Sequence, residues 1–364
     1  MRRVDVVASK EYAVWIGEGL LARAGEKIAA ACGGATVMIV TDDTVNGLYG
    51  DAFEASLRAA GYATARFVFP HGEQSKNIET YGTLLNALAE ANLTRSDVVA
   101  ALGGGVTGDL AGFAAATYLR GVRLAQIPTT LLAMVDSSVG GKTAIDLPMG
   151  KNLAGAFYQP DIVICDIDLL DSLPGDVYRD GCAEMIKHGV ILSAELFTLL
   201  KDPIGLKMEE IIARNVIIKR DIVALDEKET GMRQILNFGH TLGHGIEKHS
   251  GYAVTHGQAV AIGMVIASRG AFRMGLCDES CHREIVEAVR RYRLPEETGI
   301  SPDMLIEAAF RDKKRSGQRI TLILPEKIGA CVAKNFSLDE LATFVKLGMR
   351  TDGDGTILSS KCLS

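Results

Sequence analysis

Four of the seven histidines in this 364-residue chain lie close together in the sequence, at His240, His244, His249 and His256. His240 and His244 are four positions apart, so on a helix their rings lie on one face and could bind one ion. Imidazole nitrogen is a common ligand of zinc and related metals. Histidines with this spacing also occur in protein cores and on solvated surfaces. The pair alone therefore leaves a metal or catalytic site and a structural role both open.

A second group of polar side chains, Glu184, Lys187 and His188, has the spacing of one helix face. A Glu–Lys pair with this spacing is usually an exposed ion pair that adds little stability. Here the residues between and beside them are apolar: Ala183, Met185 and Ile186. This pattern favours a buried carboxylate at Glu184.

The glycine-rich residues 103–109 fit the pattern Gly-x-Gly-x-x-Gly between a predicted strand, 97–102, and a predicted helix, 109–118. Such a turn brings backbone N–H groups and a helix N-terminus against a pyrophosphate. The acidic ribose ligand expected about twenty positions later is missing, so Asp42 and Glu73, at the ends of earlier strands, are the better candidates. A membrane helix is excluded here, because each of the clustered glycines costs about 1 kcal/mol in a helix interior.

Residues 136–143 end in Gly-Lys-Thr, as a P-loop does, but Asp136 stands where that motif needs glycine and would repel phosphate. We interpret this stretch as a glycine-flexed loop carrying Lys142, followed by Lys151 and Asn152. Lysines in such loops suit a phosphate or a carboxylate. Solvated surface lysines are the alternative, but the apolar residues around them favour partial burial.

Short apolar segments alternate with helical ones in the first half of the chain. Strands are predicted at 36–40, 63–69, 97–102, 120–128 and 162–166, after an N-terminal hairpin of 3–7 and 12–16. The alternation predicts an α/β, Rossmann-like domain with a mostly parallel sheet, whose ligands bind beyond the carboxyl ends of the strands. From about residue 175 the periodicity becomes helical. We therefore predict two domains, 1–175 and 176–364, the second mainly α-helical with a short hairpin at 320–324 and 330–333.

Composition limits the kind of partner. The formal net charge is −6 and the pI about 5.7, which argues against a nucleic-acid surface but allows local cationic sites for a small anion. Seven cysteines without a Cys-x-x-Cys pair fit a reduced, cytoplasmic protein. The basic N-terminus is not followed by a secretory apolar segment. We expect no membrane association.

Over nearly its whole length the sequence resembles the 3-dehydroquinate synthase family of sugar-phosphate cyclases. In the first half the resemblance rests on Gly-Glu-Gln-Ser-Lys at 72–76, Gly-Gly-Gly-Val-Thr-Gly-Asp at 103–109, Val-Asp-Ser-Ser-Val-Gly-Gly-Lys-Thr at 135–143 and Gly-Lys-Asn-Leu-Ala-Gly-Ala-Phe-Tyr-Gln-Pro at 150–160. In the second half it rests on Ala-Glu-Met-Ile-Lys at 183–187, Leu-Asn-Phe-Gly-His-Thr-Leu-Gly-His at 236–244, His-Gly at 256–257 and Asp-Lys-Lys at 312–314. Together these motifs are highly specific.

The resemblance implies an NAD-binding domain, a helical metal- and substrate-binding domain, and an active site in the cleft between them. It implies that Glu184, His240 and His256 bind zinc or cobalt, with His244 near the substrate phosphate and not on the metal. The other implied substrate residues are Lys142, Lys151, Asn152, Lys187, Lys219, Arg233, Asn237 and Lys314, with Arg120 reaching the second site of a homodimer. The residues implied to line NAD are Asp42, Glu73, Lys76, Gly104, Gly105, Asp109, Thr129, Thr130, Asp136, Lys142, Lys151 and Ser172.

The implied activity is that of a carbon–oxygen lyase of the shikimate pathway, which converts 3-deoxy-D-arabino-heptulosonate 7-phosphate to 3-dehydroquinate and phosphate. Transient oxidation by NAD is followed by phosphate elimination, reduction, ring opening and intramolecular aldol closure. The alternatives are a cyclase acting on glucose 6-phosphate (the 2-deoxy-scyllo-inosose type) or sedoheptulose 7-phosphate, a metal-dependent polyol dehydrogenase, and a silent NAD-binding scaffold.

Two positions depart from the family pattern. Gln258 stands where a glutamate usually follows the last metal ligand, and His71 stands where an aspartate is common. A glutamate at 258 could orient His256, and glutamine would do so less strongly. We therefore expect an active enzyme whose metal affinity is the property most affected.

Overall fold

The computed structural model describes residues 1–313 and 319–349, and it divides into two compact units. The first unit contains Met1–Pro174 together with Lys207–Lys228, and the second contains Gly175–Leu206 and the described residues from Glu229 onward. The change of unit at 174/175 lies where the helical periodicity begins. The sequence prediction was wrong about residues 207–228, which it placed in the second domain: helix α8 (Met208–Leu225) packs against β1 (Arg2–Val7) of the first unit.

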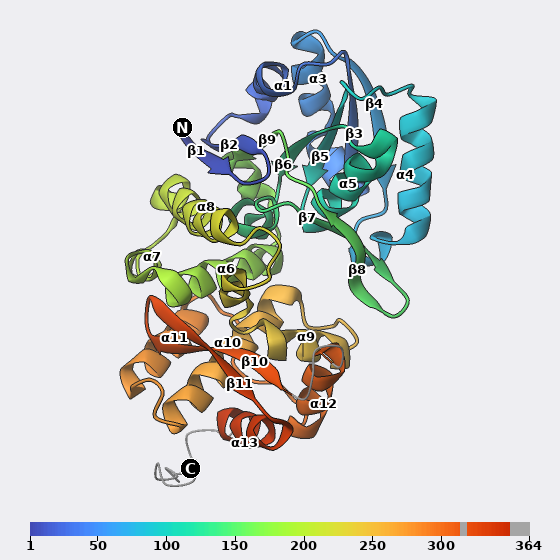
Figure 1. Ribbon diagram of the computed structural model, residues 1–364. Helices are drawn as coiled ribbons and strands as arrows, with labels where there is room; N and C mark the ends of the chain where they lie inside the picture. Colours follow the sequence, from blue (N-terminus) through green and yellow to red (C-terminus); the bar gives the residue numbers. More distant parts are fainter. Residues whose placement is uncertain (314–318, 350–364) are drawn as a thin grey trace. The chain divides into compact units, whose positions relative to one another are not determined.

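A seven-stranded sheet forms the centre of the first unit (Figure 1). Its order is β1, β2 (Glu11–Gly17), β9 (Ile162–Asp166), β6 (Arg123–Pro128), β5 (Val98–Gly103), β3 (Thr36–Asp42) and β4 (Ala63–Phe69). Only the β1–β2 pair is antiparallel, and the other pairs are parallel. Every residue of β5 and of β9 is buried, as expected for strands covered on both faces. The predicted mostly parallel α/β sheet is confirmed.

Helices cover this sheet. The segments α1 (Ala24–Cys32) and α3 (Asp51–Ala59) pack together, as do α4 (Ile78–Glu90) and α5 (Gly105–Thr117) (Figure 1). Leu88 of α4 and Leu110 of α5 are fully buried in one apolar core with Val40 and Val99 of the sheet. Helix α5 begins four residues before the predicted start at 109: the amide of Gly108 already donates to the carbonyl of Gly104, at 3.0 Å.

The glycine-flexed loop predicted before Lys142 is present, with a φ of +94° at Gly140 and +69° at Gly141. An antiparallel hairpin of β7 (Lys142–Leu147) and β8 (Gly150–Phe157), which was not predicted, follows it. Two glycines, one in the hairpin and one in the helix beside it, permit close packing. A Cβ on Gly155 would lie 2.2 Å from the carbonyl oxygen of Thr143, and a Cβ on Gly112 of α5 would lie 2.4 Å from the Thr143 methyl group. Gly155 is therefore required by strand pairing, and Gly112 by α5 lying against β7.

The second unit is mainly helical, as predicted. Its elements are α6 (Gly175–Leu192), α7 (Ala194–Leu199), α9 (His240–His249), α10 (His256–Arg273), α11 (Glu279–Arg291), α12 (Pro302–Lys313), α13 (Leu338–Met349) and the hairpin β10 (Ile320–Lys327) and β11 (Ala330–Phe336). Helix α10 is buried along nearly its whole length and contacts α6, α9, α11, α13 and β10. An apolar helix surrounded on all sides forms the core of such a unit. Within residues 1–313 and 319–349, no helix combines the length and apolar character needed to cross a membrane.

Candidate metal centre and cofactor site

Three side chains of the second unit converge with the donor atoms of a metal site. Glu184 comes from the middle of α6, whereas His240 and His256 are the first residues of α9 and α10. The Glu184 Oε1 atom lies 3.5 Å from Nε2 of His240 and 3.4 Å from Nε2 of His256. One ligand atom from each of the three lies within 4.8 Å of the others, and Glu184 is fully buried. A carboxylate and two imidazoles in this arrangement suit a divalent metal with open positions.

Glycines set the helix crossings that bring these residues together. Gly239 has a φ of +79° and lies against α10, where a Cβ would be 2.7 Å from the carbonyl oxygen of Val260. Conversely, a Cβ on Gly263 of α10 would be 2.0 Å from the Gly239 carbonyl oxygen, and one on Gly257 would be 2.3 Å from the Asp180 Cα of α6. Any side chain at these positions would push the helices apart, and the ligands with them.

Each histidine has a hydrogen-bond partner on the ring nitrogen that faces away from Glu184. Nδ1 of His240 lies 3.2 Å from the carbonyl oxygen of Phe238, and Nδ1 of His256 lies 3.2 Å from Oε2 of Glu247. Such partners fix the tautomer and leave Nε2 as the metal ligand. Sequence reasoning missed Glu247. The available signal was its spacing of seven residues from His240, which places both on one face of α9.

Burial and neighbouring charges set the protonation states of the three proposed ligands. Lys187 is 2.5 Å from Glu184 and equally buried. Burial opposes ionisation of Glu184, but Lys187 and the two histidines together outweigh it and hold the pKa of the carboxyl well below its usual range. Burial lowers the pKa of His240 to about 3, so its ring is neutral. Burial also opposes the charged form of His256, but hydrogen bonds to Glu184 and Glu247 raise its pKa to about 10. Metal binding would therefore displace a proton from His256.

Other predicted residues of the second unit surround this centre. His244 is exposed, and its ring meets that of His240 edge-on with 5.6 Å between the centroids. Arg233 is fully buried in the turn Met232–Asn237. The Asn237 amide donates to Glu229 at 3.1 Å. Lys314 lies outside the described residues.

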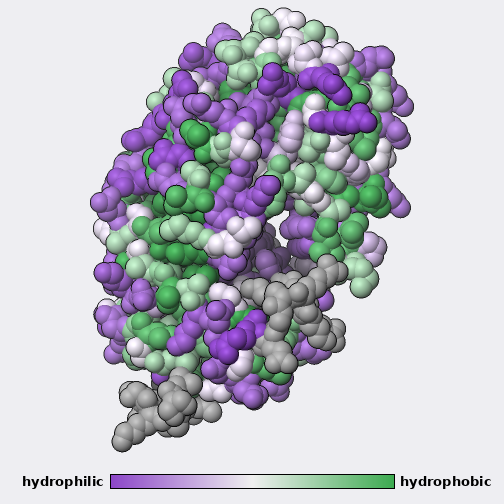
Figure 2. All heavy atoms as spheres, in the orientation of Figure 1, coloured by the Kyte–Doolittle hydropathy of each residue, from purple (hydrophilic) through white to green (hydrophobic). Residues whose placement is uncertain are grey.

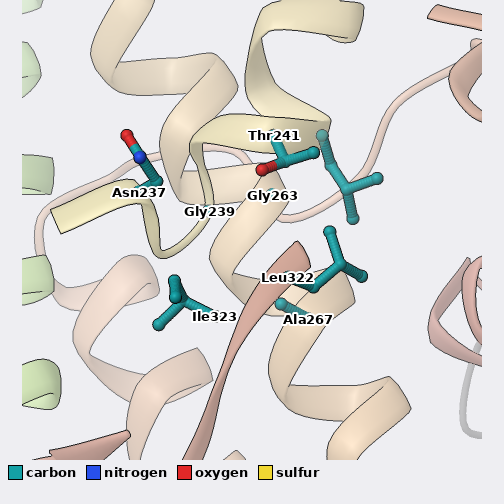
Figure 3. A pocket seen from close by; sticks show the side chains of 8 residues that line it. Asn237, Gly239, Thr241, Gly263, Ala267, Leu322 and Ile323 are labelled. Atoms are coloured by element: carbon teal, nitrogen blue, oxygen red, sulfur yellow. The ribbon is translucent and has the colours of Figure 1, made fainter. Parts of the chain in front are cut away.

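A small cavity lies beside Asn237, between the start of α9, α10 and β10 (Figure 3). Its lining residues are Asn237, Gly239, Thr241, Leu242, Gly263, Ala267, Leu322 and Ile323. Its volume of about 10 Å³ is enough for roughly one water molecule. The cavity is therefore part of the packing behind α9 and cannot hold a sugar phosphate.

In the first unit, the predicted cofactor residues gather where the parallel strands end. Asp42 and Phe69 are paired at the ends of β3 and β4, and Gly103 and Pro128 are paired at the ends of β5 and β6. Gly104, Gly105, Thr129 and Thr130 follow directly, and the Thr129 amide donates to the Gly103 carbonyl at 2.9 Å. Ligands of open α/β sheets bind at this edge, against helix N-termini such as that of α5.

Lys76 is the centre of a charged cluster at the same edge. Its ammonium group is 2.8 Å from Glu73, 3.2 Å from Asp109 and 2.8 Å from the side-chain oxygen of Asn152. Burial disfavours the charged lysine, but Asp109 and Glu73 outweigh it and raise its pKa. Burial raises the pKa of Asp109 from 3.8 to about 6, despite Lys76. Asp146, which sequence reasoning missed, accepts from the Asn152 amide at 2.8 Å and fixes its left-handed backbone.

Comparisons with known proteins show the family of the chain. The family model described as 3-dehydroquinate synthase N-terminal matches residues 66–180, and the one described as 3-dehydroquinate synthase C-terminal matches residues 181–315. The 3-dehydroquinate synthase of Pelotomaculum thermopropionicum is 41% identical over 346 residues, which cover 92% of this chain and 93% of that protein. The chain belongs to the 3-dehydroquinate synthase family.

Other members and related structures extend the match. The 3-dehydroquinate synthase of Clostridium kluyveri is 40% identical, over 95% of this chain and 98% of its own. The solved structure of 2-epi-5-epi-valiolone synthase from Streptomyces hygroscopicus, with NAD+ and Zn2+ bound, has a TM-score of 0.85 and 28% identity, over 95% of this chain and 99% of that one. A sugar-phosphate cyclase fold is therefore shown, which confirms the family resemblance found in the sequence.

The remaining residues that the resemblance implied lie in the first unit. Lys219 of α8 is 2.7 Å from both the carboxylate and the carbonyl oxygen of Asp136. Ser172 accepts a 2.6 Å hydrogen bond from Tyr49. Lys142 is exposed at the start of β7, and Lys151 of β8 is 3.9 Å from Glu73. Arg120 is exposed, with a φ of +67°.

The two departures from the family pattern are also explained locally. Gln258 forms a capping box with Thr255 at the start of α10, where its Oε1 atom accepts from the Thr255 amide at 3.4 Å. It is therefore used for the helix terminus and not for orienting His256. His71 is exposed and lies 2.8 Å from Asp43.

Proposed function

We propose that this protein converts 3-deoxy-D-arabino-heptulosonate 7-phosphate to 3-dehydroquinate and phosphate, with NAD and zinc or cobalt as cofactors. The observation that carries the proposal is the buried Glu184 carboxylate facing Nε2 of both His240 and His256, in a chain of the 3-dehydroquinate synthase family.

Glu184, His240 and His256 would hold the metal. Their fit follows from the donor set: an ionised carboxylate and two imidazoles whose Nε2 atoms point inward because their Nδ1 atoms are already hydrogen-bonded. When bound, the metal supplies Lewis-acid polarisation of a substrate hydroxyl. Lys187 keeps Glu184 ionised and presents a buried cation beside it, so it is placed to bind an anionic or hydroxyl group of the substrate.

The carboxyl edge of the first-unit sheet would hold NAD. The N-terminus of α5 at Gly105 favours a pyrophosphate, and Asp42 at the end of β3 is placed to accept from ribose hydroxyls. Ser172 and Thr130 complete the proposed lining. When bound, NAD supplies the acceptor and later the donor of a hydride.

Cationic and amide side chains of the chain would hold the substrate's phosphate, carboxylate and hydroxyl groups. The proposed set is Lys142, Lys151, Asn152, Lys187, Lys219, Arg233, Asn237, His244 and Lys314. Arg233 and Lys187 are almost completely buried, where a charge interacts more strongly than in water. Holding one anion rigidly through several steps can lower the activation free energy by several kcal/mol. Well-oriented reacting groups avoid entropic and solvent-reorganisation costs of up to about 7–11 kcal/mol.

We also propose that the enzyme is a cytoplasmic homodimer in which Arg120 reaches the second active site. The exposed Arg120 side chain supports this proposal, as do large exposed apolar residues on the β7–β8 hairpin, namely Met149, Leu153 and Phe157. Figure 2 shows a hydrophobic area where Figure 1 places this hairpin. Apolar patches of this kind are typical of protein contacts. Sedimentation equilibrium would detect the dimer, and a monomer at the assay concentration would refute it.

Incubation with different sugar phosphates tests the substrate assignment. The protein, NAD and zinc or cobalt are mixed separately with the heptulosonate phosphate, glucose 6-phosphate and sedoheptulose 7-phosphate, and products are identified by NMR. We expect phosphate and 3-dehydroquinate from the heptulosonate alone. Turnover of another sugar phosphate without reaction of the heptulosonate would establish one of the related cyclases instead. Binding of NAD without turnover of any of the three would favour the silent scaffold.

Substitution of the proposed ligands tests the metal site. Glu184→Ala and His256→Ala should lose bound metal, measured by elemental analysis after gel filtration, because each removes one of three donors. His244→Ala should retain the metal and lose activity, because His244 is assigned to the phosphate. If His244→Ala loses the metal, the ligand assignment is wrong.

A further inference from the structure

We propose that Glu247 is a positioning residue of the metal centre: its carboxylate accepts a hydrogen bond from Nδ1 of His256 and so directs Nε2 of that ring toward Glu184 and the metal. The inference rests on the proposed metal-dependent function. No family motif found in the sequence includes Glu247, which enters the site through the structure alone.

The geometry places His256 between two carboxylates. Oε2 of Glu247 lies 3.2 Å from Nδ1, and Oε1 of Glu184 lies 3.4 Å from Nε2 at the opposite side of the ring. Both glutamates are buried, at 5% and 0% exposure, whereas the His256 side chain is 35% exposed. A ring that is partly open to solvent could rotate about its χ angles, and a carboxylate on each nitrogen restricts it to one orientation.

His256 depends on a side chain for this restraint more than His240 does. The Nδ1 atom of His240 faces a backbone carbonyl two residues earlier, at Phe238, which no substitution removes. The residue two positions after His256, Gln258, caps α10. Glu247 lies instead in the second turn of α9. The orientation of the His256 ring therefore also depends on the packing of α9 against α10.

A carboxylate on Nδ1 has two chemical consequences for a metal-bound histidine. It holds the proton on Nδ1, which leaves the Nε2 lone pair available, and it increases the basicity of that lone pair. Loss of such a partner typically lowers metal affinity or activity by about 10- to 100-fold. Glutamine at position 247 could still accept through its amide oxygen but would lack the charge, so its effect should be smaller than that of alanine.

The test compares the parent protein with Glu247→Gln, Glu247→Ala and the exposed control Lys248→Ala on the same helix. Zinc affinity is measured by competition with a chromophoric chelator, cobalt coordination by the visible spectrum, and metal-free stability by thermal melting. We expect one ion per chain in all four proteins. Affinity should fall about 10- to 100-fold in Glu247→Ala, less in Glu247→Gln, and not in Lys248→Ala, and the cobalt spectrum should change in Glu247→Ala.

The outcomes separate this inference from the proposed function. If the parent protein binds no metal, the metal-dependent function fails. If it binds one ion and both Glu247 variants keep its affinity and cobalt spectrum, only the positioning role fails. Ligand atoms of His244, Glu247 and His256 also lie within 4.8 Å of one another. Two ions in the parent and one in Glu247→Ala would therefore make Glu247 a ligand of a second ion and overturn its positioning role.

Discussion

Replacing Lys187 by methionine tests how the second unit stabilises the buried Glu184 carboxylate. The two side chains are 1% and 0% exposed and 2.5 Å apart. Removing one partner of a buried ion pair costs about 3–5 kcal/mol, because the remaining charge stays in a low-dielectric environment. At about 2–4 °C per kcal/mol for a unit of this size, Lys187→Met should lower the melting temperature of the metal-free protein by roughly 6–20 °C.

Zinc or cobalt should recover part of this loss, since the ion would place positive charge beside Glu184 in place of Lys187. At a free metal concentration about 100-fold above Kd, binding contributes about 2.7 kcal/mol. The assay is thermal melting by circular dichroism with a chelator and with added metal. Lys201→Met is the matched control: Lys201 and Glu284 are 2.6 Å apart but 47% and 32% exposed, so the change should cost less than about 1 kcal/mol.

The reasoning would be refuted by a metal-free Lys187→Met protein that melts within about 2 °C of the parent, a shift worth only about 1 kcal/mol. An equal fall in melting temperature for Lys201→Met would also contradict the reasoning, because the cost of losing the lysine would then not depend on burial of the ion pair.

Two further substitutions address the helix crossing and the cofactor edge. Gly257→Ala should weaken metal binding and destabilise the protein by about 1–3 kcal/mol, since its Cβ would lie 2.3 Å from Asp180 Cα. The control is Gly82→Ala in α4, where a Cβ meets open space, and this change should stabilise the protein by about 0.5–1 kcal/mol. Equal changes in melting temperature and metal affinity for the two variants would contradict this prediction. Asp109→Asn should raise the melting temperature of the ligand-free protein at pH 8 but not at pH 4. The pKa of Asp109 in the folded protein is raised to about 6, so ionisation of this carboxyl lowers the free energy of unfolding as the pH rises from about 4 to 6, by at most about 3 kcal/mol. A higher melting temperature for Asp109→Asn at pH 4 but not at pH 8 would refute this prediction.

The sheet and its ligand-binding edge could be predicted from local sequence. Buried β-branched segments such as 36–40 and 162–166 became the parallel strands β3 and β9. Because parallel strands end at one edge, Asp42 and Gly104 were expected near each other before any distance was known. The register of β3, β5 and β6 confirms this.

Contacts between distant parts of the chain decide which histidines face Glu184, and local spacing does not reveal these contacts. The interval between His240 and His244 suggested one ion bound by both, but the structure directs His240 and His256 toward Glu184. That arrangement follows from backbone contacts between helices at Gly239 and Gly263. The family motifs anticipated the trio because they carry information about such long-range contacts.

The incorrect predictions also have tertiary causes. The β7–β8 hairpin that follows the glycine loop at Gly140 and Gly141 was not predicted, and its strand pairing leaves no room for a Cβ at Gly155. Residues 207–228 were assigned by their helical periodicity to the second domain, but α8 packs on β1 and places Lys219 on Asp136. Helical periodicity shows that a segment is amphipathic but not which apolar surface it covers.

We propose that this chain eliminates phosphate through a hydride cycle in which NAD is regenerated. The most direct test supplies the heptulosonate phosphate in large excess over NAD, with zinc or cobalt, and follows phosphate and NADH together. The account predicts many phosphates released for each NAD, matched by 3-dehydroquinate, with no net accumulation of NADH. Accumulation of NADH without phosphate release would instead show a polyol dehydrogenase and would contradict the account.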